Sequence, residues 1–189
     1  FMGTILEKSG IAAKMLENMA AAFRRIKGGL SISIIIVGAL LAASTGIVGA
    51  TVVTMGLMSL PILINQGYDK SFSTGLVAST GTLGQIIPPS IALVLLGDVM
   101  SNAYQRAQND MGIFSQQTVT VGDLFIGAIV PGIMICIGYL IYTIYKNNNN
   151  KNIKANSNGL SIEKIELFKT LALPIILIFL VLGSIFAGI

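Results

Sequence analysis

The sequence contains no histidine, no tryptophan, one cysteine and few charged side chains. Without histidine, the chain lacks the side chain most often used as a general base near neutral pH. Cys136 has no second cysteine to pair with, so it forms no disulfide within the chain and no cysteine metal site, and we expect it to pack as a small apolar side chain. Charged residues make up 11% of the chain, against about 25% in soluble domains. These absences disfavour both an enzyme and a soluble globular protein.

The chain instead has apolar residues in long charge-free runs. Hydrophobic residues make up 53% of it, and the mean hydropathy is +0.81. About 20 apolar residues span the hydrocarbon core of a bilayer, and several of the runs are at least that long. We therefore predict an all-α integral membrane protein. In a soluble chain the net charge of +4 would suggest an anionic partner, but here the basic residues are better explained as topology signals than as a nucleic-acid surface.

The positions of the charged residues divide the chain into membrane and connecting segments. We expect an amphipathic helix (1–27), a re-entrant helical hairpin (28–68), a broken transmembrane helix (71–97), an outside loop (98–121), a transmembrane helix (122–145), an Asn-rich cytoplasmic loop with a helical lead-in (146–169) and a further transmembrane helix (170–189). With residues 1–27 in the cytoplasm, every Lys and Arg except Arg106 lies on the cytoplasmic side, as the positive-inside rule requires. Because the chain begins at Phe1 and ends within an apolar run, we expect it to be an internal part of a longer membrane protein.

The most informative segment is residues 80–90, TGTLGQIIPPS, at the centre of the charge-free run 71–97. Pro88 and Pro89 each lack a backbone N–H and crowd the carbonyl group four residues earlier, so a helix is expected to break here at bilayer depth. The released carbonyl groups cannot face lipid and must be buried in protein or line a cavity. Unwound segments near the bilayer midplane form the ion and substrate sites of secondary transporters, so transport is the favoured function.

A second polar cluster lies at residues 44–51, the centre of the charge-free run 28–68. It holds small and hydroxyl residues and lacks the Asn, Asp, Lys and Pro that a water-exposed turn would usually recruit. Gly, Ser and Thr at this depth favour a re-entrant tip in contact with another buried backbone. A small-residue surface for helix packing is the alternative interpretation. Length alone does not distinguish two crossings from a re-entrant hairpin.

Two other functional classes are alternatives to transport by a carrier. Tyr68 with Asp69, and Gly97 with Asp98, are superficially similar to the paired aspartates of intramembrane aspartyl proteases, in which two carboxyl groups share a proton. On the expected topology the two carboxylates lie on opposite membrane faces, about 30 Å apart, so the chain is predicted not to be an enzyme. A passive channel is the runner-up because broken helices also build selectivity filters. A long hairpin paired with a broken helix favours a moving carrier.

Several motifs occur together in a characteristic order. They are Thr45-Gly46 followed by Ala50, Leu60-Pro61, Gly67-Tyr68, Ala78-Ser79-Thr80, Gly81, Gly84 and Ile87-Pro88-Pro89-Ser90, together with Phe1-Met2-Gly3, Lys8-Ser9-Gly10 and Pro131-Gly132. With these motifs the chain resembles, over nearly its whole length, the DctM-like large membrane subunit of TRAP transporters, the tripartite ATP-independent periplasmic carriers. The ordered pair of hairpin tip and I-P-P-S is the specific part of this resemblance.

The resemblance implies an elevator-type carrier of the ion transporter superfamily kind, built from two inverted repeats, of which this chain holds the first. It implies a multi-pass protein of the bacterial inner membrane that imports a small organic acid or related solute with sodium. The implied partners are a small TRAP membrane subunit and a periplasmic solute-binding protein, and the 98–121 loop becomes periplasmic. A stand-alone ion-coupled carrier of the same fold is the alternative.

The resemblance also implies site residues by position. A sodium ion (Na+) would be bound by backbone oxygens of Thr45, Gly84, Ile87 and Pro89, with the Thr45 hydroxyl assisting, because hard cations prefer oxygen ligands. Further candidates for the ion or the substrate are Gly46, Thr51, Thr80, Thr82 and Ser90. Many family members carry an acidic residue where this chain has Thr51, so a carboxylate-dependent role at that position is in doubt. For any single hydroxyl, a hydrogen bond to a carbonyl group of the preceding helical turn is the alternative role.

Overall fold

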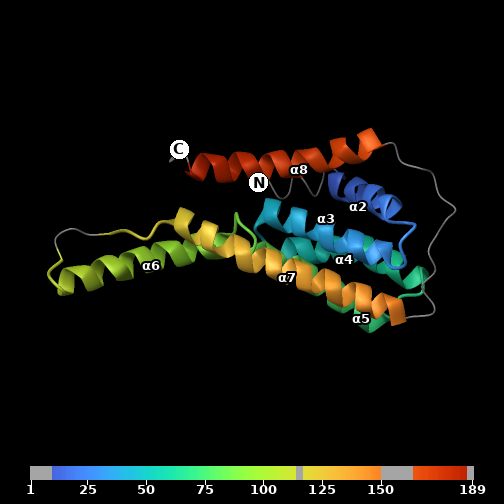
Figure 1. Cartoon of the computed structure of the whole chain (residues 1–189), viewed down its shortest axis with the longest axis horizontal. Coiled ribbons are helices and arrows are strands. Elements are labelled where there is room, and N and C mark those ends of the chain that lie inside the picture. Colours follow the sequence, from blue (N-terminus) through green and yellow to red (C-terminus); the bar gives the residue numbers. More distant parts are fainter. Residues whose placement is uncertain (1–9, 114–116, 150–163, 187–189) are drawn as a thin grey trace.

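The computed structural model describes residues 10–113, 117–149 and 164–186, and the secondary structure of these residues is entirely helical (Figure 1). The elements are α2 (Ile11–Ala22), α3 (Gly29–Thr45), α4 (Val48–Asn65), α5 (Lys70–Thr82), the 3-10 helix η1 (Leu83–Gln85), α6 (Ile91–Asp110), α7 (Val121–Asn149) and α8 (Lys164–Phe186). The prediction of an all-α protein is confirmed for these residues. The parts of the expected layout that fall on residues 1–9, 114–116, 150–163 and 187–189 lie outside the described residues.

Two helices in the described part of the chain, α4 and α7, are long and apolar enough to cross a bilayer. Only 22% of the apolar window of α4 and 11% of that of α7 are buried inside the structure. A core helix of a soluble protein would be mostly buried, so these two helices present their apolar surfaces outward, as a membrane protein does. The shorter helix α3 is also apolar.

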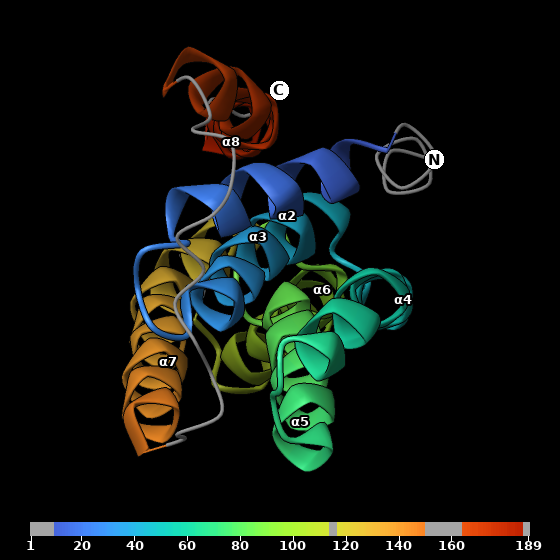
Figure 2. The same ribbon diagram turned by 90° about the vertical axis from the view of Figure 1, so that its right-hand side faces the viewer.

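Helix α3 is the centre of the fold. It packs against α2, α4, α5, α7 and α8. Figure 2 shows it below α2, with α7 on one side and α4 and α5 on the other. Ile34, Ile35 and Val37 on this helix are fully buried, which fits a helix that is hydrophobic on all sides. Its buried Ser31 and Ser33 satisfy their hydroxyls on backbone carbonyl groups one turn earlier, so no polar group of theirs faces the apolar core unpaired.

Helices α3 and α4 are joined by a very short turn. Gly46 follows α3 in the left-handed conformation (φ +63°), and its N–H donates to the carbonyl oxygen of Ala42 at 2.9 Å. Ile47 is extended, and α4 begins at Val48. A glycine in this conformation is the commonest way to end a helix. The chain therefore turns within the small-residue cluster 44–51.

The run 71–97 is interrupted between α5 and α6. Helix α5 ends at Thr82, η1 follows, and regular helix resumes only at Ile91. Ser90 is extended and caps α6 with its hydroxyl, which accepts from the N–H of Leu93 at 3.4 Å. The Pro88–Pro89 peptide bond is cis. Helical geometry is thus lost where the two prolines remove backbone donors.

Two helices run further than the charge pattern predicted. Helix α6 continues to Asp110, into the expected outside loop 98–121, and extends away from the other helices (Figure 1). No glycine or proline interrupts it after Gly97 until Gly112 (φ +69°). Helix α7 likewise continues to Asn149, past the expected end at residue 145. Charged residues indicate where a helix leaves the apolar interior of a membrane. The helix itself ends only where the backbone conformation changes, so the two positions can differ.

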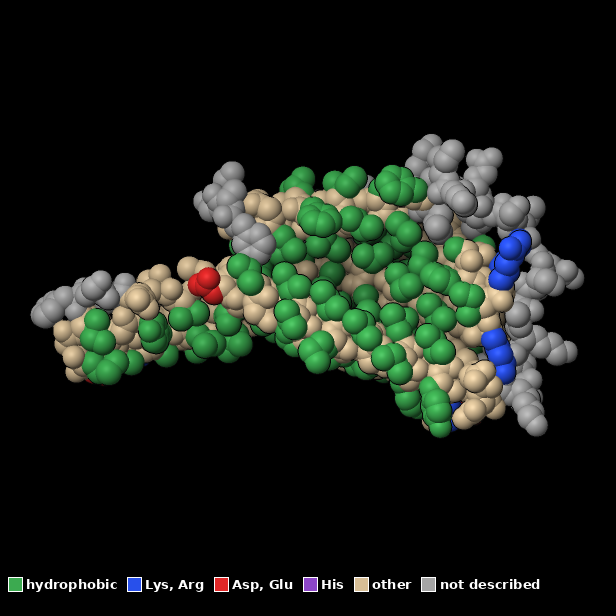
Figure 3. All heavy atoms as spheres, in the orientation of Figure 1, with side chains coloured by type: hydrophobic (Ala, Val, Ile, Leu, Met, Phe, Trp, Pro, Cys, Tyr) green, Lys and Arg blue, Asp and Glu red, His purple; other side chains and the backbone are tan. Residues whose placement is uncertain are grey.

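Figure 3 shows Lys and Arg side chains gathered at the end of the molecule where α7 ends.

Candidate functional site

The turn between α3 and α4 packs directly against the break between α5 and α6. A Cβ atom at Gly46 would lie 3.1 Å from the carbonyl oxygen of Pro89 and 3.7 Å from the backbone nitrogen of Ile91. From the other side, a Cβ atom at Gly84 would lie 3.0 Å from the carbonyl oxygen of Ala42. Backbone therefore meets backbone at two places, and glycine at both positions allows the close approach.

Two hydroxyl groups meet across the turn. Thr45 Oγ1 and Thr51 Oγ1 are 2.9 Å apart. Either hydroxyl can donate to the other, because each also has a carbonyl oxygen within reach, and that of Thr51 is the carbonyl oxygen of Ile47 at 3.0 Å. The contact of Thr45 Oγ1 with the Ala42 carbonyl oxygen is longer, at 3.4 Å. Thr45 Oγ1 thus keeps lone pairs that a cation can use.

Ser90 closes the break from inside. Its hydroxyl donates to the carbonyl oxygen of Gln85 at 2.9 Å, and the residue is only 1% exposed. One carbonyl group near the break is therefore satisfied within the chain. Ser90 also caps α6. Its hydrogen bonds with Gln85 and Leu93 therefore both hold the backbone of the break in place.

The three remaining candidates, Thr80, Thr82 and Ile87, lie around the break but away from the place where the break contacts the turn. Thr80 is buried, donates to the carbonyl oxygen of Leu76 at 2.6 Å and turns its methyl group toward Gly38 of α3. Thr82 is exposed and donates to the carbonyl oxygen of Ser79 at 2.7 Å. The side chain of Ile87 lies toward Gly132 of α7, where its Cγ1 would be 3.4 Å from an added Cβ. In this arrangement the Thr80 side chain packs against α3, the Thr82 hydroxyl stays within its own helix, and the Ile87 side chain packs against α7. All three residues stay predicted candidates for the ion or the substrate, Ile87 through its backbone oxygen.

Sequence reasoning missed two residues at this place. The carbonyl oxygen of Ala42 accepts from the N–H of Gly46 and lies against Gly84. Its position four residues before a helix-ending glycine was the signal that could have found it. Gly132 brings α7 onto the far side of the break, because a Cβ there would lie 3.8 Å from the carbonyl oxygen of Ile86. The Pro131-Gly132 pair at the centre of an apolar helix hinted at a close contact, but not at its partner.

The ends of four helices surround the break. Helix α3 and the α5–η1 unit end here, while α4 and α6 begin here, and α3, α4 and α6 all pack against η1. Helix C-termini carry partial negative charge and helix N-termini partial positive charge. No Asp, Glu, Lys or Arg occurs within residues 28–68 or 71–97. The local field at the site is therefore set by backbone dipoles and hydroxyl groups.

This donor set suits a hard cation. No group of three or more His, Cys, Asp or Glu side chains that could hold a metal ion occurs among the described residues. The oxygens present are backbone carbonyl groups at helix C-termini and the Thr45 hydroxyl, and such oxygens are the ligands that hard cations prefer. The residues at the turn and the break fit a monovalent or divalent hard cation better than a transition metal.

Comparison with known proteins identifies relatives along the whole chain. The family model described as "Tripartite ATP-independent periplasmic transporter, DctM component" matches residues 1–189. The chain is 32% identical over 187 residues to the C4-dicarboxylate TRAP transporter large permease protein DctM of Rhodobacter capsulatus, covering 99% of this chain and 42% of that protein. It is 33% identical over 136 residues to the ectoine TRAP transporter large permease protein TeaC of Halomonas elongata, covering 71% of this chain and 28% of that protein.

A third relative extends the range of solutes named. The chain is 25% identical over 189 residues to the sialic acid TRAP transporter large permease protein SiaM of Vibrio cholerae, covering 98% of this chain and 39% of that protein. In each of these three comparisons the chain spans less than half of the relative's length.

Proposed function

The chain belongs to the DctM family of tripartite ATP-independent periplasmic transporters, and from this premise we propose that it forms the first half of the transport site of a sodium-coupled permease. Large permeases of this family are integral membrane proteins of solute transport systems that depend on a periplasmic binding protein. The observation that carries the proposal is the backbone contact between Gly46 at the turn and Pro89 at the break. Secondary transporters build their ion sites from such broken helices.

The sodium site is proposed at this contact. Thr45 contributes its hydroxyl oxygen, which keeps at least one free lone pair whichever threonine donates in the bond between them. Gly84, Ile87 and Pro89 contribute backbone carbonyl oxygens near the end of the α5–η1 unit. Sodium, when bound, supplies the coupling of uptake to the ion gradient. The partial negative charge of the helix C-termini supports a cation here, without any charged side chain.

The proposed substrate is a small organic acid or a related solute. The names of the relatives include C4-dicarboxylate, ectoine and sialic acid carriers. No basic side chain occurs within the runs 28–68 and 71–97 to pair with a carboxylate. An anionic group would therefore be held by helix N-termini or by parts of the transporter outside this chain.

The proposed architecture is an elevator-type carrier in a bacterial inner membrane. In it, α3 and α4 form a re-entrant hairpin, α5 and α6 form the broken membrane helix, and residues 1–27 face the cytoplasm. The outward apolar surfaces of α4 and α7 and the basic end of the molecule support this placement. The proposed partners are a small membrane subunit and a periplasmic solute-binding protein, with the region around residues 98–121 as the docking candidate.

The full-length large subunit is expected to be inactive by itself. The runs 28–68 and 71–97, which hold this chain's part of the proposed transport site, contain no charged side chain that could capture an anionic solute from water, so we assign capture to the binding protein. The test is uptake of labelled organic acids into liposomes with an inward sodium gradient. The subunit is assayed alone, with the small subunit, and with both partners, and only the last combination should transport.

Two results would contradict this proposal in different ways. Robust sodium-driven uptake by the large subunit alone would refute the tripartite requirement and favour a stand-alone ion-coupled carrier. Solute flux that equilibrates without any ion gradient and without partners would instead favour a channel. Insertion of the protein into the liposomes is checked by protease protection before the uptake assay, and only preparations that have inserted are used.

Thr45→Val is expected to raise the sodium concentration for half-maximal uptake about tenfold, because removing one hydroxyl ligand costs on the order of 1–2 kcal/mol and 1.4 kcal/mol is tenfold. Thr51→Val should have a smaller effect, since the Thr51 hydroxyl contacts Thr45 and the Ile47 carbonyl oxygen but is not one of the four proposed sodium ligands. Thr82→Val is the matched control: its hydroxyl is exposed and bonded within α5. The assay is sodium-dependent uptake by the complete transporter. If the Thr45 variant shows the same sodium dependence as the Thr82 variant, Thr45 is not a sodium ligand.

A further inference from the structure

A separate cavity lies between α5 and α7, near the start of α5 and the end of α7. Its volume is about 420 Å³, and its walls come from these two helices. The break and the turn lie at the opposite end of α5. The cavity is therefore distinct from the proposed ion site and has no role in it.

The walls of the cavity change in character along its length. On α7, Lys146, Thr143 and Tyr139 line it at intervals of three and four residues, so they lie on one face of the helix. On α5 and its cap, Asp69, Phe72 and Leu76 line it at the same intervals. On both walls, charge near the helix end gives way to aromatic and apolar side chains further in. This sequence of polarity matches a molecule with a charged head and an apolar tail.

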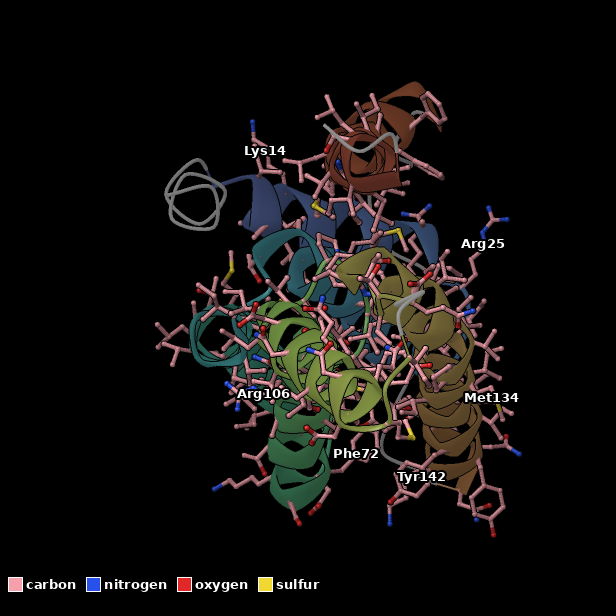
Figure 4. All side chains as sticks on the ribbon, turned by 90° about the vertical axis from the view of Figure 1, so that its left-hand side faces the viewer. Lys14, Arg25, Phe72, Arg106, Met134 and Tyr142 are labelled. Carbon is pink, nitrogen blue, oxygen red and sulfur yellow. The ribbon has the colours of Figure 1, made fainter. Side chains whose placement is uncertain are left out.

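Aromatic rings form the middle of the cavity. The rings of Phe72 and Tyr142, which also lines the cavity, have centroids 6.4 Å apart at an angle of 36°, and Figure 4 shows the two side chains near each other. Phe72 also stacks on Tyr68 at 6.2 Å. Tyrosines next to a lysine near the end of an apolar helix are typical of the membrane–water interface. The charged part of the cavity therefore lies at the level of lipid headgroups.

Thr143 provides an independent sign of a missing partner. The residue is 1% exposed, and its Oγ1 has no hydrogen-bond partner among the described residues. A buried hydroxyl without a partner is unfavourable, and such groups are uncommon in folded proteins. Thr143 is one of the residues that line the cavity, so we assign the missing partner of its hydroxyl to a molecule bound there.

We propose that this cavity binds an aminophospholipid, with phosphatidylethanolamine as the headgroup class that fits. The phosphate lies at Lys146, the primary ammonium at Asp69, and an ester oxygen of the glycerol accepts from Thr143, one helical turn deeper than Lys146. The acyl chain follows Phe72 and Tyr142. The opposite charges of Asp69 and Lys146 match the two charges of this headgroup. Phosphatidylglycerol has no cation for Asp69, and the quaternary ammonium of phosphatidylcholine has no N–H to donate.

The test uses the full-length protein, delipidated in detergent and titrated with phosphatidylethanolamine, phosphatidylglycerol or phosphatidylcholine of identical acyl chains. Bound lipid is counted by native mass spectrometry. Phosphatidylethanolamine should bind tightest. Lys146→Gln and Thr143→Val should each weaken it about tenfold, the size expected for losing one hydrogen bond to a charged or buried group. Asp69→Asn should reduce the preference for phosphatidylethanolamine over phosphatidylglycerol while keeping α5 capped, since Asn is as good an N-cap as Asp.

Two glycine-to-leucine variants, one inside the cavity and one outside it, separate loss of lipid binding from a defect in folding. Gly75 lines the cavity, and a Cβ there meets no atom within 4 Å, so Gly75→Leu should fill the space without moving the backbone and should abolish tight lipid binding. Gly127 of α7 also has open space but does not line the cavity, so Gly127→Leu should bind lipid as the wild type does. Equal binding of all three headgroups would overturn the proposal. So would unchanged affinity in Thr143→Val and Gly75→Leu, or a full-length structure with a protein segment in the cavity.

Discussion

Gly84→Ala is expected to reduce sodium-dependent uptake by the complete transporter by tenfold or more while the protein still folds. The added Cβ would lie 3.0 Å from the Ala42 carbonyl oxygen and 3.3 Å from its Cβ, so α3 and η1 must separate by a few tenths of an ångström. The nearest neighbour is a backbone atom, which cannot turn aside as the end of a flexible side chain does. Overpacking of this kind costs about 1–3 kcal/mol. Oxygen ligands hold a hard cation within narrow distance limits, so a shift of this size lowers ion affinity.

Gly49→Ala is the matched control for this prediction. Gly49 lies in the first turn of α4, close to the same turn, but is exposed, and a Cβ there meets no atom within 4 Å. Alanine in a helix is favoured over glycine by about 1 kcal/mol, so this variant should be at least as stable as the wild type and should transport normally. Uptake is measured against sodium concentration, and folding by thermal melting in detergent. Wild-type sodium dependence in Gly84→Ala would refute the site at the α3–η1 contact.

Gly46→Ala is expected to impair both stability and transport, because two penalties combine at one residue. The left-handed backbone (φ +63°) costs an alanine about 1–2 kcal/mol. Its Cβ would also lie 3.1 Å from the Pro89 carbonyl oxygen, one of the proposed sodium ligands. Gly46→Asn separates the two causes, since Asn tolerates the left-handed conformation but still carries a Cβ.

The control for Gly46 is Gly112, which has a similar backbone conformation (φ +69°) and open space around it. Gly112→Ala should show the conformational penalty alone, as a small loss of thermal stability with normal uptake. If Gly46→Asn transports normally, the contact with the break is not needed for transport and Gly46 only ends a helix. If both Gly46 variants lose uptake while Gly112→Ala keeps it, the contact itself is required.

The break and the turn could be predicted because both follow from local backbone chemistry. Pro88 and Pro89 prevent a continuous helix in any surroundings, since they lack the N–H and crowd the preceding turn. Gly46 marks a helix end for an equally local reason. Small residues around both places indicated that the two backbones meet, and the structure brings Gly46 against Pro89. The family resemblance rested on the same residues and is confirmed by the match over residues 1–189.

The direction of each side chain could not be predicted from the sequence. Thr45, Thr51, Thr80 and Thr82 are the same residue type in similar apolar surroundings, and each of their hydroxyls contacts a carbonyl oxygen in its own helical neighbourhood. Only the rotation of the helices decides which of them faces the break. That rotation depends on packing between segments distant in sequence, such as Thr80 against Gly38 of α3.

Composition and charge spacing by themselves determined an all-α membrane protein, and the order of glycines, hydroxyl residues and prolines determined its family and the places where its helices turn and break. The tertiary structure alone decided that α3 is the buried centre, that Gly132 of α7 covers the break, and that α5 and α7 enclose a cavity with an unpaired Thr143 hydroxyl. The physical reason is the distance over which each effect acts. Proline and glycine act on the backbone within one helical turn, whereas burial and cavities depend on how separate helices pack.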